Sequence, residues 1–287
     1  MRISAFTFIK NGSILGYPFV ESIKSILEIV DEFVINVGKS EDDTLKKIKS
    51  INSPKIKILE SEWNENMSNR GYVYGQQKMI AQFNCTGDWA FYIECDEIYH
   101  EDDLDKIYNA MQTHKNNSNV EALLMNFIHF YGNANTYVNS PGWYRSEARI
   151  IKNNIRSYAP DGLFWLVLEK NKIGRYPKAI NIDVNCYHYG WVRNENSMKL
   201  KSEYVSKYWG TSPKKIDYAQ IDSKILKKFN GSHPKIIRNW LPKEKGVFNA
   251  DPKHILSKKE RKHRIMLIIE RLFKLDLCKK HFKLIKL

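Results

Sequence analysis

Cysteine is scarce in this chain of 287 residues, and long apolar runs are missing. The four cysteines lie far apart: Cys85, Cys95, Cys186 and Cys278. They form no CxxC pair and no dense cluster, which argues against a disulfide framework and against a zinc knuckle. No apolar run approaches the roughly 18 residues of a membrane span, and residues 1–9 are too short and too interrupted for a signal peptide. A cytoplasmic protein is therefore expected.

Charge is unevenly distributed along the chain. The net charge is +14, but residues 253–287 alone carry 12 Lys and Arg against 3 Asp and Glu, whereas the remaining 252 residues carry a net charge of only +5. A strongly basic chain invites comparison with nucleic-acid binders, but here the excess lies mostly in one terminal segment. We therefore expect no nucleic-acid partner.

The same C-terminal segment is also apolar. Within residues 253–287, apolar residues such as those at 265–269 stand amid lysines, which is typical of a basic amphipathic helix. Two interpretations stay open. The helix rests on an anionic membrane surface, as a peripheral contact on the inner face, or it docks on its own domain with a solvated lysine face.

The first 130 residues alternate between patterns typical of strands and of helices. Strands are predicted at residues 3–8, 33–37, 55–59, 89–93 and 122–130, and helices at 20–30, 44–51 and 72–83. Such alternation favours an α/β fold, with a mostly parallel open sheet flanked by helices. Further helices are predicted at residues 198–209 and 214–229, so that a helical C-terminal extension follows the sheet.

Acidic residues gather at the end of the strand predicted at 89–93. Glu94 and Asp96 are one residue apart, so they point to the same side of an extended chain and repel each other unless a cation lies between them. Mg²⁺ or Mn²⁺ prefers such carboxylates together with substrate phosphates. Cys95 points the other way, and packing rather than metal ligation is expected of it.

Three ordered motifs resemble the glycosyltransferases of the GT-A fold, family 2. Residues 4–11 resemble the first strand and its Asn-containing loop, residues 36–44 the second strand and its acidic turn, and residues 87–97 the metal motif. The similarity covers roughly residues 1–195. It implies a Rossmann-like catalytic domain at 1–195, an acceptor-side extension at 196–252 and the basic tail at 253–287.

The resemblance also implies roles for individual residues. Nucleotide-sugar binding is implied for Phe8, Asn11, Asn36, Gly38, Asp42, Arg70, Gln77, Glu94 and Cys95. Asp96 would coordinate a Mn²⁺ or Mg²⁺ ion, with Glu94 and a late histidine, His188, as further ligands. The family places its catalytic base after the fifth strand, where Asp161 in a Pro-Asp-Gly turn is the first choice and Glu147 the second.

The function that follows is transfer of a sugar from a UDP- or GDP-sugar to a glycan or a lipid-linked acceptor, inverting by direct displacement. Two alternatives stay open. A nucleotidyltransferase would share the sheet and the metal carboxylates, although residues 10–16 make a poor phosphate loop. A nonenzymatic binder of nucleic acid or of an anionic surface would depend on the basic tail.

Overall fold

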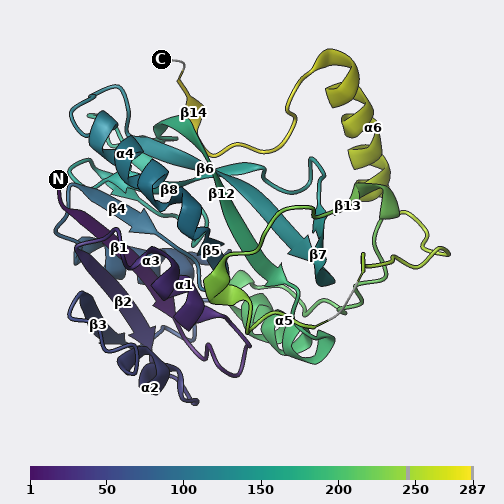
Figure 1. Cartoon of the computed structure of the whole chain (residues 1–287), viewed down its shortest axis with the longest axis horizontal. Coiled ribbons are helices and arrows are strands. Elements are labelled where there is room, and N and C mark those ends of the chain that lie inside the picture. Colours follow the sequence, from purple (N-terminus) through teal and green to yellow (C-terminus); the bar gives the residue numbers. More distant parts are fainter. Residues whose placement is uncertain (244–245, 286–287) are drawn as a thin grey trace.

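The structure is a computed structural model that describes residues 1–243 and 246–285. One large mixed β-sheet forms its centre, with helices on both faces (Figure 1), and a separate small sheet has three strands. The predicted α/β fold is thereby confirmed.

The strands of the large sheet are β1 (Ile3–Ile9), β2 (Glu32–Gly38), β3 (Ile56–Ser61), β4 (Trp89–Tyr92), β5 (Glu97–Tyr99), β6 (Ala122–Tyr131), β7 (Asn133–Val138), β8 (Ser146–Lys152), β12 (Lys178–Trp191), β13 (Leu226–Lys228) and β14 (Lys283–Leu284). The small sheet comprises β9 (Ser157–Tyr158), β10 (Leu166–Leu168) and β11 (Gly174–Arg175). The α-helices are α1 (Phe19–Ile26), α2 (Thr44–Lys49), α3 (Tyr72–Phe83), α4 (Leu104–His114), α5 (Glu195–Trp209) and α6 (Lys258–Phe273).

The large sheet has a parallel half and a mixed half. Strands β3, β2, β1 and β4 are adjacent in that order and all parallel. Beyond β4 the direction reverses, because β8 pairs antiparallel with both β4 and β6, while the long strand β12 runs parallel to β6. The carboxyl ends of the parallel strands therefore share one edge with the carboxyl-terminal part of β12, which carries His188 opposite β5.

Alternating side chains bury both faces of this sheet. In β1, Ala5 packs with helices α1, α2 and α4 on one face, and Phe6 packs with α3 and Trp165 on the other. Successive side chains of the strand thus enter the two hydrophobic cores in turn, one on each face of the sheet.

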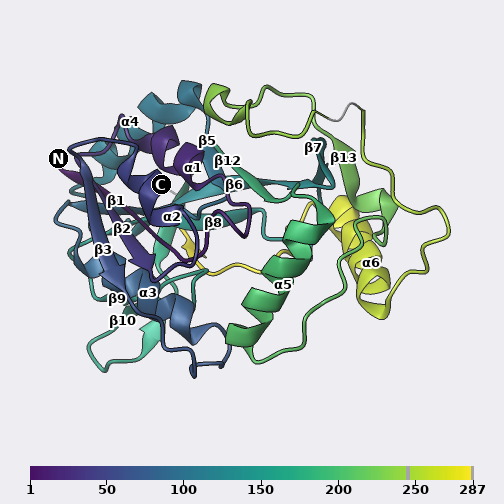
Figure 2. The ribbon, with the colours of Figure 1, turned by 90° about the horizontal axis from the view of Figure 1, so that it is seen from below.

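The C-terminal third departs from its predicted form. The helix predicted at 198–209 is confirmed as α5, and the tail contains α6 as expected. The helix predicted at 214–229 is wrong, since this segment forms turns, a short 3₁₀ helix (Ser223–Ile225) and strand β13. Viewed from below (Figure 2), α5 lies next to α3, and α6 stands apart from the layered body.

Strands from the C-terminal third also join the large sheet. Strand β13 pairs with β7, and β14 pairs with β12. The division into parts at residues 195 and 252 stays a prediction. No helix within residues 1–243 and 246–285 is long and apolar enough to cross a membrane.

Candidate active site

A pocket opens at the carboxyl edge of the parallel strands. Its volume is about 330 Å³, within the roughly 300–1,000 Å³ of small-molecule sites. Aromatic side chains form much of its wall: Phe8, Tyr17, Trp63, Tyr74, Tyr92, Trp191, Tyr204, Tyr208 and Trp209. Polar groups enter it from Glu94, Asp96, His188 and Lys201.

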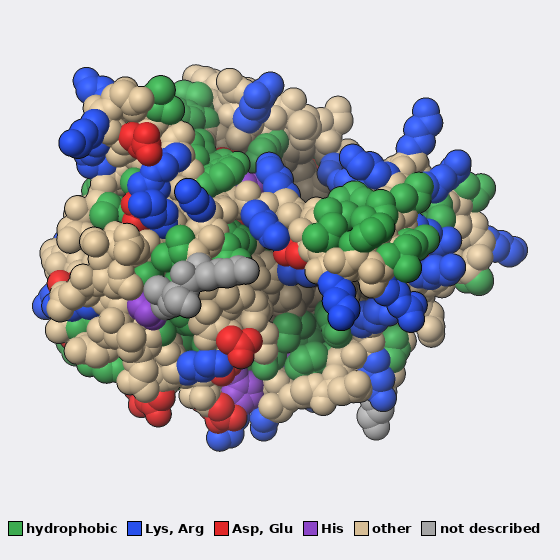
Figure 3. All heavy atoms as spheres, turned by 90° about the horizontal axis from the view of Figure 1, so that it is seen from above, with side chains coloured by type: hydrophobic (Ala, Val, Ile, Leu, Met, Phe, Trp, Pro, Cys, Tyr) green, Lys and Arg blue, Asp and Glu red, His purple; other side chains and the backbone are tan. Residues whose placement is uncertain are grey.

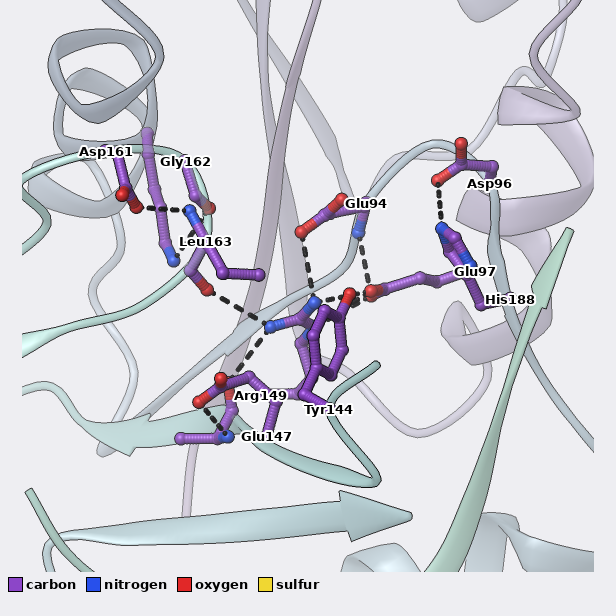
Figure 4. A network of polar contacts seen from close by, with 12 residues as sticks. Glu94, Asp96, Glu97, Tyr144, Glu147, Arg149, Asp161, Gly162, Leu163 and His188 are labelled. Atoms are coloured by element: carbon purple, nitrogen blue, oxygen red, sulfur yellow. Dashed lines mark hydrogen bonds and ion pairs between the residues drawn. The ribbon is translucent and has the colours of Figure 1, made fainter. Parts of the chain in front are cut away.

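The two acids of the motif separate instead of converging. The chain turns after β4, where the amide of Glu97 donates to the carbonyl of Glu94 (3.0 Å), so the segment is not extended. The side chains of Glu94 and Asp96 consequently reach different partners on opposite sides of the turn (Figure 4). The expectation that both carboxylates point to the same side is wrong, because it assumed an extended backbone.

Asp96 is buried and surrounded by positive charge. Its Oδ2 accepts hydrogen bonds from Arg193 Nη2 (2.5 Å) and Lys201 Nζ (3.2 Å), and its Oδ1 lies 3.6 Å from His188 Nε2. Burial alone would raise the pKa of Asp96, but Lys201 and Arg193 outweigh burial and hold it below its usual value. Asp96 is therefore an anion at neutral pH.

A second buried histidine, His129, orients His188. His129 Nε2 lies 2.7 Å from the carbonyl oxygen of Tyr144, so this nitrogen must carry a hydrogen and donate it. Burial lowers the pKa of both His129 and His188, which favours neutral rings. In a neutral His129, Nδ1 is an acceptor, and His188 Nδ1 donates to it across 3.0 Å.

The remaining nitrogen of His188 then presents a lone pair to Asp96. A lone pair and a carboxylate oxygen repel each other unless a cation lies between them, and ligands of one divalent ion stand roughly 3–4 Å apart. Space for an ion is preserved by Gly190, because a Cβ there would lie 2.6 Å from His188 Nε2 and 3.1 Å from Asp96 Oδ2. Asp96 Oδ1 and His188 Nε2 therefore fit a divalent ion.

Glu94 belongs to a second, buried network. Arg149, which is fully buried, donates to Glu97 (2.6 Å) and Glu94 (3.0 Å), and also to the carbonyl oxygen of Leu163 (3.3 Å). Burial and the neighbouring Glu97 raise the pKa of Glu94, while Arg149 opposes them. The side chain of Glu94 stays 29% exposed, toward the pocket. Arg149 engages Oε1 of Glu94, and a role of Glu94 as a metal ligand beside Asp96 stays a prediction.

Four of the other predicted residues support the pocket from behind. Asn11 is buried, donates to the hydroxyl of Tyr204 (2.6 Å) and so ties the loop after β1 to α5. Asn36 donates to Gln77 Oε1 (2.8 Å), which joins β2 to α3. Gly38 lies so close to the pocket residue Trp63 that a Cβ would be 2.5 Å from its Nε1.

Asp42 and Arg70 lie outside the pocket lining, as do Asn11, Asn36, Gly38 and Gln77. Asp42 accepts from the amides of Ile14 and Thr44 and so holds two loops, and Arg70 is exposed. Phe8 and Cys95 do line the pocket. The thiol of Cys95 lies 3.5 Å from Thr7 Oγ1, and burial raises its pKa to about 12, which suits packing.

The two candidate bases lie in different environments. Glu147 is fully buried and paired with His281 of the C-terminal segment (2.6 Å), away from the pocket lining. Asp161 is partly exposed, and its Oδ1 accepts from the amide of Leu163 (2.8 Å). Gly162 and Leu163 line the pocket, so the loop of Asp161 borders it (Figure 4).

Sequence reasoning missed three polar residues of the site. Lys201 on α5 and Arg193 after β12 bind Asp96 from about 100 positions further along the chain, and His129 orients His188. No local pattern marks the two cations. His188 itself was predicted from the family resemblance, which places a late histidine on the metal.

A protein-family comparison agrees with the fold and the motif. The model described as glycosyl transferase family 2 matches residues 18–166, just over half of the chain. The chain belongs to glycosyl transferase family 2. The predicted enzyme class, glycosyltransferase, is confirmed with it, and nothing supports the nucleotidyltransferase or the nonenzymatic alternative.

Solved structures with distant similarity carry related names. S. aureus TarS is 17% identical over 71% of this chain and 40% of that chain, with a TM-score of 0.43, and its fragment 1–349 is 16% identical over 53% and 47%, with a TM-score of 0.37. A Mycobacterium tuberculosis glucosyl-3-phosphoglycerate synthase in complex with Mn²⁺ and UDP-glucose is 14% identical over 74% of this chain and 80% of that chain, with a TM-score of 0.40. The chain spans less than half the length of either TarS structure. No curated protein matches the sequence.

Proposed function

We propose that this chain transfers a sugar from a nucleoside-diphosphate sugar, UDP- or GDP-linked, to a glycan or a lipid-linked saccharide, with inversion at the transferred sugar. The observation that carries the proposal is the facing pair of Asp96 Oδ1 and His188 Nε2 in an aromatic pocket. Family membership supports the reaction class.

A divalent ion, Mn²⁺ or Mg²⁺, would be held by Asp96 and His188. When bound, such an ion neutralises charge on the departing diphosphate. Lys201 lines the same pocket and donates to Asp96, so its ammonium group would contact the diphosphate oxygens and add to that neutralisation. Arg193 does not line this pocket, and its role would be to hold the Asp96 carboxylate in place.

The aromatic wall would hold the nucleotide and the sugar. Phe8 stacks on Tyr92 with an interplanar angle of 10°, and Trp63 stands edge-on to Tyr74 and Tyr208. Planar apolar faces with polar tips suit a base and a sugar ring. The residues proposed for the nucleotide then divide by position: Phe8, Glu94 and Cys95 contact it, and Asn11, Asn36, Gly38 and Gln77 position the surrounding loops.

Asp161 remains the proposed base for the acceptor hydroxyl. Its loop borders the pocket, whereas Glu147 is buried outside the pocket lining and contacts His281. Asp161→Asn keeps an oxygen for the Leu163 amide and removes the basic carboxylate, so kcat should fall roughly 10²–10⁴-fold with unchanged stability. Glu147→Gln should instead reduce stability, because it breaks a buried pair. An Asp161→Asn enzyme with normal kcat would remove Asp161 from this role.

Donor turnover tests the proposed function as a whole. The purified chain is incubated with UDP- and GDP-sugars, with Mn²⁺ or with EDTA, and release of the nucleoside diphosphate is followed. Hydrolysis that requires the ion, and that is lost in Asp96→Asn and His188→Ala, is expected. Asp105→Asn, an exposed acid on α4, is the matched control and should behave like wild type. Absence of turnover and of ion-dependent binding for every donor would refute the proposal.

A further inference from the structure

Helix α6 docks on the protein mainly through polar side chains, beside the partly buried Leu267. Arg264 donates twice to the buried Asp222 (both 2.7 Å), and Glu270 accepts two hydrogen bonds from Arg145 (2.8 and 2.9 Å). His263 packs so closely on Gly142 that a Cβ there would lie 2.2 Å from the imidazole. Both acids of the helix, Glu260 and Glu270, are therefore engaged in contacts with the rest of the chain.

The opposite side of the helix is apolar and exposed. Ile265, Ile268 and Leu272 lie at i, i+3 and i+7, on one face, and are 59%, 59% and 71% exposed. Phe273 continues this face at 68% exposure. These four residues are the outer face of α6. A helix usually turns its apolar stripe toward the core, so the orientation of α6 is inverted, and a contiguous exposed stripe indicates an external partner.

Positive charge surrounds the outer face. The exposed cations of the helix and its C-cap are Lys258, Lys259, Arg261, Lys262, Arg271 and Lys274. None of them forms an ion pair with an acid within residues 1–243 and 246–285. The two acids of the helix itself pair with Arg145 and His254 instead. Figure 3 shows such an apolar patch rimmed by Lys and Arg on the right of the molecule.

We propose that the outer face of α6 binds an anionic lipid surface, with the helix lying parallel to the membrane. Aliphatic side chains that enter the headgroup boundary and cations that pair with anionic headgroups are the two parts of such a contact. A nucleic acid would use the cations but leave the apolar stripe in water. A second copy of this chain would bring two cationic rims together, which like-charge repulsion opposes.

The contact would also orient the active site. The inner side of α6 packs on residues 142–145, and the Tyr144 carbonyl oxygen in this segment holds His129, which in turn holds His188. A membrane at α6 would thus lie on the side of the protein where the histidine pair is anchored. The surface itself is separate from the pocket, so its binding does not depend on the proposed sugar transfer.

Sedimentation with lipid vesicles tests the proposal on the full chain. Vesicles of phosphatidylcholine alone are compared with vesicles containing one quarter phosphatidylglycerol, at low and at high salt. Binding only to the anionic vesicles, weaker at high salt, is expected. Lys262→Gln should lower the affinity about fivefold, and Ile265→Gln/Ile268→Gln/Leu272→Gln should lower it roughly tenfold or more.

Phe83→Gln removes a 75% exposed aromatic from α3 and serves as the control, with wild-type binding expected. Phe273→Trp gives a direct measure of insertion, because its fluorescence should shift to the blue with anionic vesicles. Unchanged binding of the triple variant, or failure of the wild type to bind anionic vesicles, would overturn the proposal. Dimerisation through α6 without lipid would overturn it as well. So would a protein that binds duplex DNA instead of vesicles, if the triple variant keeps that DNA binding.

Discussion

Replacing Arg149 tests how the buried charge network supports the site. The guanidinium is fully buried and joins Glu97, also fully buried, to Glu94 and to the Leu163 carbonyl oxygen. Arg149→Met keeps much of the side-chain volume and removes the charge. Glu97 is then left as an anion in the protein interior without its partner, because desolvation of a buried charge is costly unless it is paired.

The expected loss of unfolding free energy is about 3–5 kcal/mol, the usual result of removing one partner of a buried ion pair. Adding Glu97→Gln to Arg149→Met should recover part of that loss, since no unpaired charge remains. Arg175→Met is the control: this arginine also bridges two acids, Glu121 and Glu169, but its side chain is 31% exposed. A change of about 0–1 kcal/mol is expected there.

Urea denaturation, followed by tryptophan fluorescence and extrapolated linearly to water, measures all four proteins. Affinity for the donor nucleotide should fall in Arg149→Met as well, because Glu94 and the loop at Leu163 both border the pocket. If Arg149→Met lowers stability no more than Arg175→Met does, the network does not stabilise the site as argued here.

Three further predictions concern the ion site and helix α6. His129→Ala should weaken Mn²⁺ binding about 10–100-fold in calorimetric titration, because the group that orients a ligand is lost; unchanged affinity would contradict the assigned orientation of His188. Gly190→Ala should abolish Mn²⁺ binding, since its Cβ would lie 2.6 Å from His188 Nε2 and displace this ring, and normal binding would place the ion elsewhere. Hydrogen bonds from Arg264 lower the pKa of Asp222 below its ordinary value of 3.8, against the opposing effect of burial. The pair therefore stabilises the fold fully above pH 3.8. This stabilisation is lost as the pH falls through the lower pKa that Asp222 has in the folded protein. The difference in unfolding free energy between wild type and Arg264→Gln should therefore shrink in acid, and a difference that grows below pH 3.8 would contradict the pairing.

Local patterns predicted the first half of the fold because its strands are short and buried. The run Trp89–Tyr92 is buried on both faces and ends in acids, so the sequence predicted a ligand site at its end, where the structure has a pocket. The segment 214–229 misled the same reasoning. Its apolar residues, among them Ile216 and Ile221, pack against Tyr131 and Tyr218 from turns, so tertiary contacts override the helical pattern.

The chemistry of the site was only partly readable. Asp96 and His188 were named from resemblance, and the structure brings them to 3.6 Å. The side chain of Glu94 is held by Arg149, and the charge around Asp96 comes from Arg193 and Lys201. Such partners meet only in the folded chain, so no spacing within one segment could reveal them.

A crystal structure with UDP and Mn²⁺ tests the central claim most directly. The ion should be coordinated by Asp96 Oδ1 and His188 Nε2, with the diphosphate beside Lys201 and the base among the aromatic residues of the pocket. UDP bound away from this pocket, or UDP within it while Asp96 and His188 hold no ion, would contradict the account.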